Sequence, residues 1–289
     1  MLEHNYCLIC HSKDLKSLET YNKSFLCKCN SCGFVFSKKI PTTEELESYY
    51  QGYGINSYLS PITVKRYHEL LDEFEPFRKT NKLLDVGCGI GFFLDEAKKR
   101  GWEIYGTELS DKAYTICAEK GIRIKKGLLD PTNYKPGMFD IITSFEVIEH
   151  INNPENELKN FNTILRDEGL VYITTPNFNS ILRYHLKAKY NIISYPEHLS
   201  YYTPKTLTKA FKLSGFKKIK VETTGISLTR FKTSKGSSDQ KIISSKSDDE
   251  KIRNKVEKQK HLQLAKKILN SILTVLGKGD SLKGWFIKK

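Results

Sequence analysis

Residues 83–91 have the sequence LLDVGCGIG, an apolar run that ends at Asp85 and continues into three glycines at alternate positions. Residues 92–99 follow with the spacing of an amphipathic helix. The pattern predicts a buried strand that turns sharply into a helix, through a loop whose bare backbone lets a ligand come close. The spacing is G-x-G-x-G and differs from the G-x-G-x-x-G of dinucleotide folds.

A second acidic residue favours a ligand at this loop. Glu108 ends the apolar stretch 102–107, twenty-three residues after Asp85. An acid at that place can accept hydrogen bonds from both ribose hydroxyls of an adenosine-containing cofactor. The alternative is that the glycines form only a turn, and it does not account for the position of Glu108. We therefore expect a cofactor site here.

The cysteines predict a second, separate site. Five of the seven cysteines lie in the first 32 residues, and four of them form two C-x2-C pairs separated by eighteen residues: Cys7, Cys10, Cys29 and Cys32. This is the spacing of a closed four-thiolate zinc site, in which the metal contributes to folding. Cys27 is a spare thiol that could compete as a ligand. Disulfides are the alternative, and they do not fit a reducing compartment.

Strands and helices alternate from residue 82 onward, which predicts an α/β fold with a doubly wound parallel sheet. The expected strands are 82–86, 103–107, 122–126, 139–144, 169–174, 216–223 and 281–287. Four parts follow from the pattern: a zinc-ribbon module over 1–40, a helical connector or lid over 41–80, the main domain over 81–223 and 281–289, and an insertion over 224–280.

The connector and the insertion each leave alternatives open. A helix start at 42–45 and a helix at 61–79 flank an aromatic loop with Tyr49, Tyr50, Tyr53 and Tyr58, which either packs the modules together or covers the cofactor. Residues 232–250 are rich in Ser, Lys and Asp and are expected to be disordered. A helix with a Lys-rich face follows within 251–276, and it covers its own domain, forms a dimer or contacts an anionic membrane.

Two further segments resemble known enzymes. Residues 144–151, SFEVIEHI, resemble the V-x-E-H segment of small-molecule methyltransferases, including ubiquinone-pathway O-methyltransferases. With the glycine loop and Glu108, they resemble the site of class I S-adenosylmethionine-dependent methyltransferases. Residues 195–207 resemble the P-E-H-x-x-Y-[FY] segment of zinc-knuckle methyltransferases associated with bacterial surface-glycan synthesis. The resemblance implies a seven-stranded Rossmann-like sheet of order 3-2-1-4-5-7-6 and the cofactor S-adenosylmethionine.

The resemblance also assigns site residues. It places His150 opposite the transferring methyl group, although a capping role is the alternative. We favour His198 as the general base, because it lies on an irregular segment that could contact the acceptor, with Glu146 or Glu149 assisting. Leu128 replaces the polar residue of many relatives, which leaves Leu129 and Asp130 as the nearest candidates for adenine. The cofactor-binding residues are expected to be Asp85, Gly87, Cys88, Gly89, Gly91, Glu108, Leu109, Leu129, Ser144 and Phe145.

Charge does not favour a nucleic-acid partner. The formal charge is +14, yet the basic residues are 39 Lys and only 8 Arg, with no Arg cluster. Arg is the preferred residue for bidentate phosphate recognition, so a solvated Lys-rich surface accounts better for the charge. The first 19 residues do not resemble a signal peptide, and no apolar run approaches the ~20 residues of a membrane span. We expect a cytoplasmic protein, with membrane association through 251–276 left open.

These features together lead us to expect methyl transfer from S-adenosylmethionine to a sugar hydroxyl of a surface-glycan precursor or nucleotide sugar. Alternatives are C-methylation of a keto-deoxysugar, methylation of RNA or of another small molecule, and a zinc-ribbon binding module on an inactive methyltransferase fold. The intact Asp85, glycines and Glu108 argue against the inactive form. The sequence does not fix the acceptor or the oligomeric state.

Overall fold

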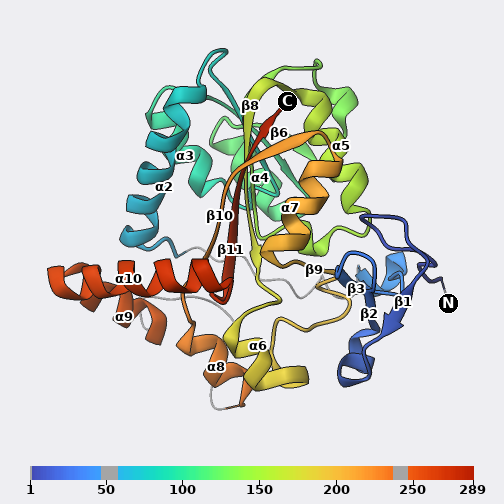
Figure 1. The fold of residues 1–289 in the computed structure, drawn as a ribbon. Helices are drawn as coiled ribbons and strands as arrows, with labels where there is room; N and C mark the ends of the chain where they lie inside the picture. Colours follow the sequence, from blue (N-terminus) through green and yellow to red (C-terminus); the bar gives the residue numbers. More distant parts are fainter. Residues whose placement is uncertain (1, 47–57, 237–246) are drawn as a thin grey trace.

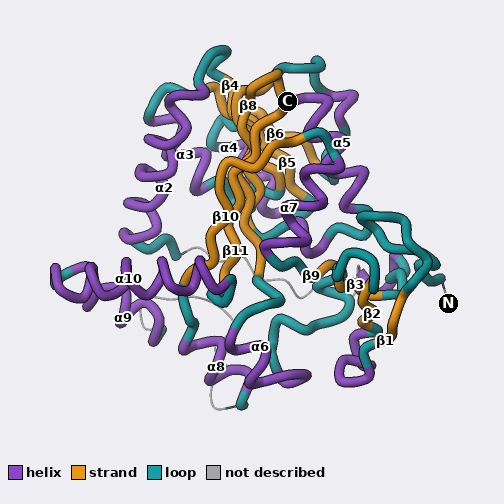
Figure 2. The backbone as a smooth tube through the Cα atoms, viewed as in Figure 1, coloured by secondary structure: helices purple, strands orange, loops and turns teal. Residues whose placement is uncertain are grey.

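The structure is a computed structural model that describes residues 2–46, 58–236 and 247–289. A seven-stranded sheet runs through the centre of the protein (Figures 1 and 2). Within this sheet, the first five strands along the chain pair in parallel, whereas β11 is antiparallel to both of its neighbours. This arrangement confirms the predicted order. In spatial order the strands are β10 (Phe216–Thr224), β11 (Ser281–Lys288), β8 (Leu165–Pro176), β7 (Phe139–Phe145), β4 (Lys82–Val86), β5 (Glu103–Glu108) and β6 (Arg123–Lys126).

Helices cover both faces of this sheet (Figure 1). One face packs against α2 (Pro61–Phe74), α3 (Phe92–Lys99) and α4 (Asp111–Glu119), and the other against α5 (Pro154–Ile164) and α7 (Pro204–Leu213). Neighbouring strand residues point to opposite faces. Leu83 therefore belongs to the cluster of α2 and α3, whereas Leu84 belongs to that of α5 and α7. Both side chains are fully buried, which stabilises the fold by about 1.5–3 kcal/mol for each.

Helix caps explain where the connecting helices begin. Thr42 and Glu45 cap one another, as the predicted helix start requires, and residues 43–46 are helical. Ser60 caps α2, and Pro61 occupies its first turn. The α2 helix ends at Phe74 and continues as a 3₁₀ turn, η2 (Glu75–Phe77). Tyr49, Tyr50 and Tyr53 lie outside the described residues, so the choice between packing and a lid stays a prediction.

A second, small sheet carries the cysteines. It consists of β1 (Leu15–Ser17), β2 (Leu26–Cys29), β3 (Val35–Ser37) and β9 (Ser200–Tyr201), all antiparallel. The fourth strand comes from the segment just after His198, far from the other three along the chain. The remaining short elements are η1 (Glu19–Ser24), η3 (Pro131–Asn133), η4 (Ile148–His150), α6 (Ile181–Leu186) and η5 (Lys187–Lys189).

The insertion is more ordered than its composition indicates. It contains α8 (Leu228–Ser234), α9 (Asp248–Glu257) and α10 (Lys260–Leu276). The expectation of disorder over 232–250 is therefore wrong at both ends of that stretch, and 237–246 lie outside the described residues. One of the polar residues that suggest disorder acts as a cap: the Asp249 carboxylate accepts hydrogen bonds from the first backbone N–H groups of α8.

No helix in the described ranges is both long enough and apolar enough to cross a membrane.

Candidate functional site

The glycine loop has the open backbone that its sequence predicts. Gly87, Gly89 and Gly91 have φ angles of +70°, +54° and +79°, a region that side chains rarely adopt. A Cβ atom on Gly87 would lie 2.6 Å from Val147 Cγ2, whereas one on Gly89 would meet nothing within 4 Å. The loop therefore packs tightly against residue 147 at one end and leaves open space at Gly89.

Glu108 closes this loop from the next strand. Its Oε2 accepts a hydrogen bond of 2.8 Å from the backbone N–H of Gly89, and its Oε1 accepts one of 2.8 Å from that of Ser110. Each carboxylate oxygen can accept a second hydrogen bond. The carboxylate is thus held beside the loop with acceptor capacity left, as a role toward ribose hydroxyls requires.

Asp85 lies beneath the loop in a buried position. Its Oδ1 accepts a hydrogen bond of 2.7 Å from the hydroxyl of Thr143 on the neighbouring strand. Burial raises the pKa of Asp85 to about 7, and the Thr143 hydrogen bond partly opposes this shift. A ligand cation or hydrogen-bond donor at the loop would favour the ionised form. Sequence patterns do not single out Thr143, since its role follows only from the pairing of β4 with β7.

The other predicted cofactor residues fall into two groups. Cys88 turns its sulfur inward, where a Cβ atom on Gly106 would lie 2.8 Å away, so the close packing needs glycine at 106. Leu129 is 6% exposed and packs in the core, and Ser144 is also buried. Leu109 and Leu128 are exposed, and Asp130 caps η3 through its bonds to Thr132. Which of them meets adenine stays a prediction.

Phe145 ends β7 within an aromatic cluster. Its ring centroid lies 5.0 Å from that of Phe93, 5.5 Å from that of Tyr172 and 6.1 Å from that of Tyr67 on α2. The connector helix therefore packs directly against a predicted cofactor residue. This contact ties residues 61–74 to the site.

The two predicted catalytic histidines lie side by side. The ring centroids of His150 and His198 are 4.8 Å apart, although the residues come from η4 and from the loop before β9. His150 Nδ1 lies 2.6 Å from the carbonyl oxygen of Glu197, and His198 Nδ1 lies 2.7 Å from that of Ile192. A carbonyl can only accept, so both Nδ1 atoms donate, and in each neutral ring the lone pair is on Nε2.

Glu149 completes this cluster. One ligand atom from each of Glu149, His150 and His198 lies within 4.8 Å of the other two. The carboxylate accepts a hydrogen bond of 3.0 Å from the Thr175 hydroxyl, a contact that the sequence gives no signal for. Two imidazoles and a carboxylate could bind a substrate hydroxyl or hold a divalent metal.

Burial keeps all three side chains of this cluster close to their uncharged forms. It lowers the pKa of His198 to about 3, with the neighbouring His150 adding to the shift, and it lowers the pKa of His150 as well. It raises the pKa of Glu149 well above its usual value, with Glu146 adding to the shift. His198 is 7% exposed, whereas His150 is partly exposed. Of the two rings, His150 is therefore the more accessible to a ligand.

The histidine cluster adjoins the glycine loop. Val86 of β4 pairs with Ser144 of β7, so the two strands end at the same edge of the sheet. Val147, which fills the space beside Gly87, lies three residues before His150. The structure thus brings the predicted cofactor loop and the predicted catalytic histidines to one edge.

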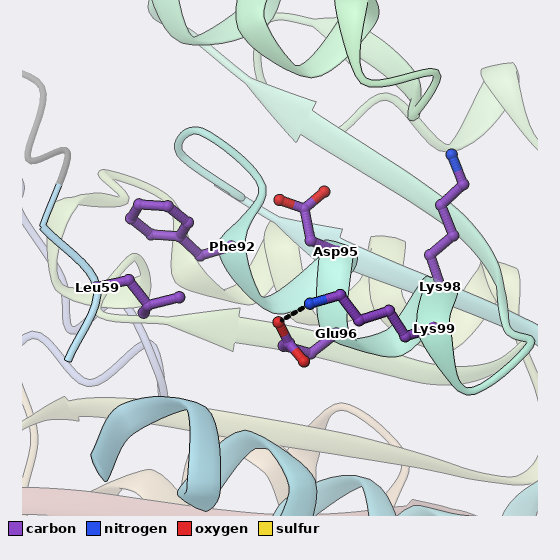
Figure 3. Close-up of a pocket in the computed structure, with 6 residues that line it drawn as sticks. All are labelled: Leu59, Phe92, Asp95, Glu96, Lys98 and Lys99. Atoms are coloured by element: carbon purple, nitrogen blue, oxygen red, sulfur yellow. Dashed lines mark hydrogen bonds and ion pairs between the residues drawn. The ribbon is translucent and has the colours of Figure 1, made fainter. Parts of the chain in front are cut away.

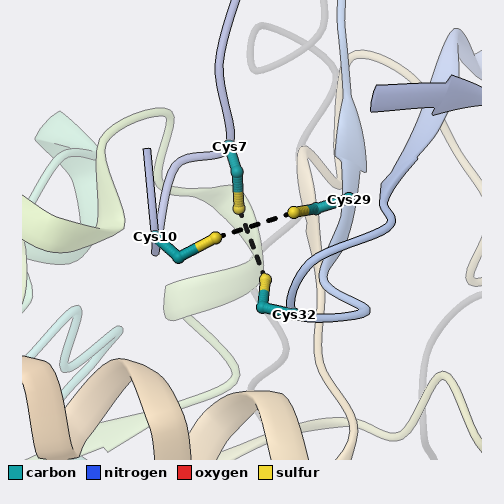
Figure 4. A group of neighbouring side chains, drawn as sticks. All are labelled: Cys7, Cys10, Cys29 and Cys32. Atoms are coloured by element: carbon teal, nitrogen blue, oxygen red, sulfur yellow. Dashed lines mark hydrogen bonds between the residues drawn. The ribbon is translucent and has the colours of Figure 1, made fainter. Parts of the chain in front are cut away.

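The four cysteines form a compact cluster (Figure 4). The sulfur atoms of Cys7 and Cys32 are 3.5 Å apart, and those of Cys10 and Cys29 are 3.6 Å apart. A tetrahedral site with Zn–S bonds of about 2.3 Å places its sulfur atoms about 3.8 Å apart. The donor set therefore fits zinc in both chemistry and spacing. Cys27 is buried and stays outside this group of four.

Each C-x2-C pair ends in the same turn. The backbone N–H of Gly33 donates to the carbonyl of Cys29, and that of His11 donates to the carbonyl of Cys7. Both residues have positive φ angles, +81° and +57°. The turn at Gly33 was predictable from its glycine. His11 lies at the equivalent position, directly after the second cysteine of its pair, and this shared spacing is the signal that would have indicated its turn.

The hollow shown in Figure 3 lies elsewhere, on the outer side of α3. Glu96 and Lys99 form an ion pair of 2.6 Å within it. Of its residues, only Phe92 adjoins the glycine loop. We assign no site to it. Its lining residues are Leu59, Phe92, Asp95, Glu96, Lys98 and Lys99.

Relatives of known name share parts of this chain. Ubiquinone biosynthesis O-methyltransferase of Azoarcus sp. is 27% identical over 155 residues, which are 43% of this chain and 66% of that protein. The enzyme of the same name from Chromobacterium violaceum is 31% identical over 106 residues, 34% of this chain and 46% of that protein. The chain thus matches from about half to just under two thirds of these relatives' length.

Solved structures share the fold. A SAM-dependent methyltransferase from Archaeoglobus fulgidus has a TM-score of 0.53 at 19% identity, covering 84% of this chain and 98% of that one. Phosphoethanolamine N-methyltransferase 2 of Haemonchus contortus, solved with S-adenosyl-L-methionine, has a TM-score of 0.53 at 20% identity, covering 88% of this chain and 61% of that one. These similarities establish a Rossmann-like methyltransferase fold.

A family model described as a methyltransferase domain matches residues 58–221, more than half of the chain. The match includes the glycine loop, Glu108 and both histidines. The chain belongs to this methyltransferase domain family.

Proposed function

We propose that the protein transfers a methyl group from S-adenosylmethionine to a hydroxyl oxygen of its acceptor. One observation carries the proposal: a glycine loop closed by the Glu108 carboxylate adjoins, through Val147, the segment that holds His150. Asp85, Gly89 and Glu108 would hold the cofactor at this loop. When bound, S-adenosylmethionine supplies an electrophilic methyl group on its sulfonium. The O-methyltransferase names of the relatives support oxygen as the acceptor atom.

The chain's own contribution to the reaction is alignment and proton removal. Holding the acceptor oxygen in line with the methyl group provides most of the acceleration. A ring Nε2 lone pair within hydrogen-bond reach of the hydroxyl then takes its proton, which adds about 10²–10⁴-fold. The sequence favours His198 for this step, but its burial favours His150. We therefore propose that the His150 ring faces the acceptor and that His198 orients the His150 ring.

The same cluster supports a second role, in which a divalent metal binds the acceptor oxygen. Both histidines donate Nδ1–H to a backbone carbonyl, the arrangement that fixes Nε2 toward a metal. Treatment with a chelator separates the two roles, provided that the zinc content of the four-cysteine cluster is followed in parallel. Activity that survives chelation supports proton transfer alone. A loss of activity that added Mg²⁺ or Mn²⁺ reverses, while the zinc content stays unchanged, supports the divalent metal.

For the acceptor, we propose a sugar hydroxyl of a surface-glycan precursor or nucleotide sugar. Support comes from the joint presence of the four-cysteine cluster and the segment 195–207, which lie together because β3 pairs with β9. Zinc in the cysteine cluster is part of the same proposal and has a structural role.

A panel of acceptors with labelled S-adenosylmethionine tests the acceptor proposal. Label on the oxygen of a nucleotide sugar or lipid-linked saccharide supports it. Label on carbon, on RNA or on a quinone precursor assigns the activity to one of the alternatives.

A further inference from the structure

The helix α10 exposes most of its apolar side chains. Only Leu273 of its 17 residues is buried. Val275 is 86% exposed and Ile268 is 54% exposed. At about 3.6 residues per turn, the exposed apolar side chains fall within an arc of roughly 140°. They are Leu264, Ile268, Leu269, Ile272, Val275 and Leu276, and we call this arc the outer face of α10.

Polar contacts hold the helix in this orientation. Thr274 Oγ1 donates to the carbonyl of Thr223, and the Thr223 hydroxyl donates to the carbonyl of Leu273. Asn270 accepts a hydrogen bond of 3.0 Å from the backbone N–H of Gly225. A surface helix of a globular protein normally turns its apolar stripe toward the core. Here the side that faces the protein carries Asn270 and Thr274 beside the buried Leu273, while most of the apolar side chains point outward. The outer face therefore needs another apolar environment.

Lysines border this face. Lys260 and Lys267 are exposed and lie next to the apolar arc on the helix. On the adjoining α9, Lys251, Lys255 and Lys258 line a surface hollow. The whole chain carries a formal charge of +14. An apolar stripe with lysines at its border matches a bilayer whose headgroups are anionic. A second copy would bring an equally basic border against this one, which repels.

We propose that the outer face of α10 docks on the surface of a bilayer that contains anionic lipids. The apolar side chains enter the headgroup boundary, to a depth of about 5–10 Å for helices of this kind, and the lysines contact lipid phosphates. Thr224 pairs with Ser281, and Ser281 pairs with Pro176, so α10 lies at the sheet edge where β8 ends. The glycine loop and the histidines lie at this same edge. Docking through α10 would therefore bring the proposed active site close to the lipid surface. This consequence rests on the proposed function, whereas the docking itself does not.

Flotation of the full chain with vesicles tests the docking. We expect binding to phosphatidylcholine vesicles that contain about one third phosphatidylglycerol, and binding about tenfold weaker to phosphatidylcholine alone. The affinity of the double variant Ile268→Gln/Val275→Gln for the anionic vesicles should be lower by about tenfold or more, since each change removes one inserted apolar side chain. Lys260→Gln/Lys267→Gln should bind more weakly at low salt and show a smaller salt dependence.

Leu213→Gln is the matched control. Leu213 is 59% exposed and ends α7, just before β10 begins. The start of β10 lies at the end of the strands opposite to α10. Leu213→Gln should bind vesicles like the wild type, and all variants should keep the wild-type melting temperature. No binding of the wild type to anionic vesicles, or equal binding by Ile268→Gln/Val275→Gln, overturns the proposal. A dimer in light scattering that this double variant dissociates also overturns it and assigns the face to a second copy. Cofactor titration is a separate measurement, so the two proposals fail independently.

Discussion

The backbone N–H of Ser37 donates a hydrogen bond of 2.8 Å to the carbonyl oxygen of Leu199, next to His198. This bond belongs to the pairing of β3 with β9, which adds a strand from the segment just after His198 to the cysteine sheet. The core continues across the junction, because the ring of Phe34 lies 5.1 Å from that of Tyr202. The cysteine cluster thus supports the position of His198 from a distance.

The first prediction concerns this support. Cys29→Ser should remove zinc, lower the stability of the protein by about 2 kcal/mol or more, and reduce turnover more than cofactor affinity. Cys27→Ser is the matched control, because Cys27 is equally buried on β2 but lies outside the cluster. Elemental analysis, thermal unfolding and cofactor titration check the three effects. Wild-type protein that contains no zinc and has normal stability would contradict the proposed zinc site.

The second prediction concerns the ribose. Glu108→Gln should weaken S-adenosylmethionine binding by about 10–100-fold, because it removes a charged acceptor of hydrogen bonds. Glu103→Gln is the control on the same strand, where the exposed carboxylate pairs with Arg123. Calorimetric titration of both variants measures the difference. Equal affinities would remove Glu108 from the cofactor site.

The third prediction separates packing from ligand approach in the glycine loop. Gly87→Ala should destabilise the fold, since its Cβ would meet Val147 and its φ angle is unfavourable. Gly89→Ala has open space and should cost less stability, while its methyl group projects where the cofactor would approach. The double variant Gly87→Ala/Val147→Ala should recover part of the lost stability. Thermal unfolding with and without cofactor orders the variants, and equal losses for both alanines would contradict the packing difference.

The fourth prediction concerns the histidines. His150→Ala should lower kcat by about 10²–10⁴-fold with little change in cofactor affinity. His198→Ala should lower kcat less and raise the acceptor KM, because its role is to orient its neighbour. His185 on α6 is exposed, and His185→Ala serves as the control. Steady-state kinetics with the identified acceptor measures these effects. A larger loss of kcat in His198→Ala would return the base to His198.

The fifth prediction concerns pH. The pKa of His198 is lowered to about 3 in the folded state. The unfolded chain therefore takes up a proton near pH 6.5 that the folded chain does not, so stability from this residue is present above about pH 6.5 and is lost as the pH falls. Relative to His198→Asn, the wild type should lose up to ~1.4 kcal/mol per pH unit below that point. Denaturant unfolding at several pH values checks the slope, and parallel slopes would contradict a neutral buried ring.

Much of the main domain was predictable because its signals are local. Each expected strand overlaps an observed one, and the family resemblance added the strand order. The pairing of β3 with β9 was not predictable, because β9 has two residues and its partner is more than 160 positions away. The cap of α8 was missed for a related reason. Asp249 stabilises α8 across a stretch whose composition alone indicates disorder.

The candidate site was predictable as a list and not as a geometry. The sequence placed His150 and His198 among the catalytic candidates, but their tautomers depend on the carbonyls of Glu197 and Ile192. Burial, which the sequence does not give, shifts the preference from His198 to His150. The choice between them is still a prediction.

Calorimetric titration of the folded wild-type protein with S-adenosylmethionine tests the central claim most directly. We expect saturable binding with a stoichiometry of about one, weakened in Glu108→Gln and unchanged in Glu103→Gln. The absence of binding to protein that retains its fold would contradict the account.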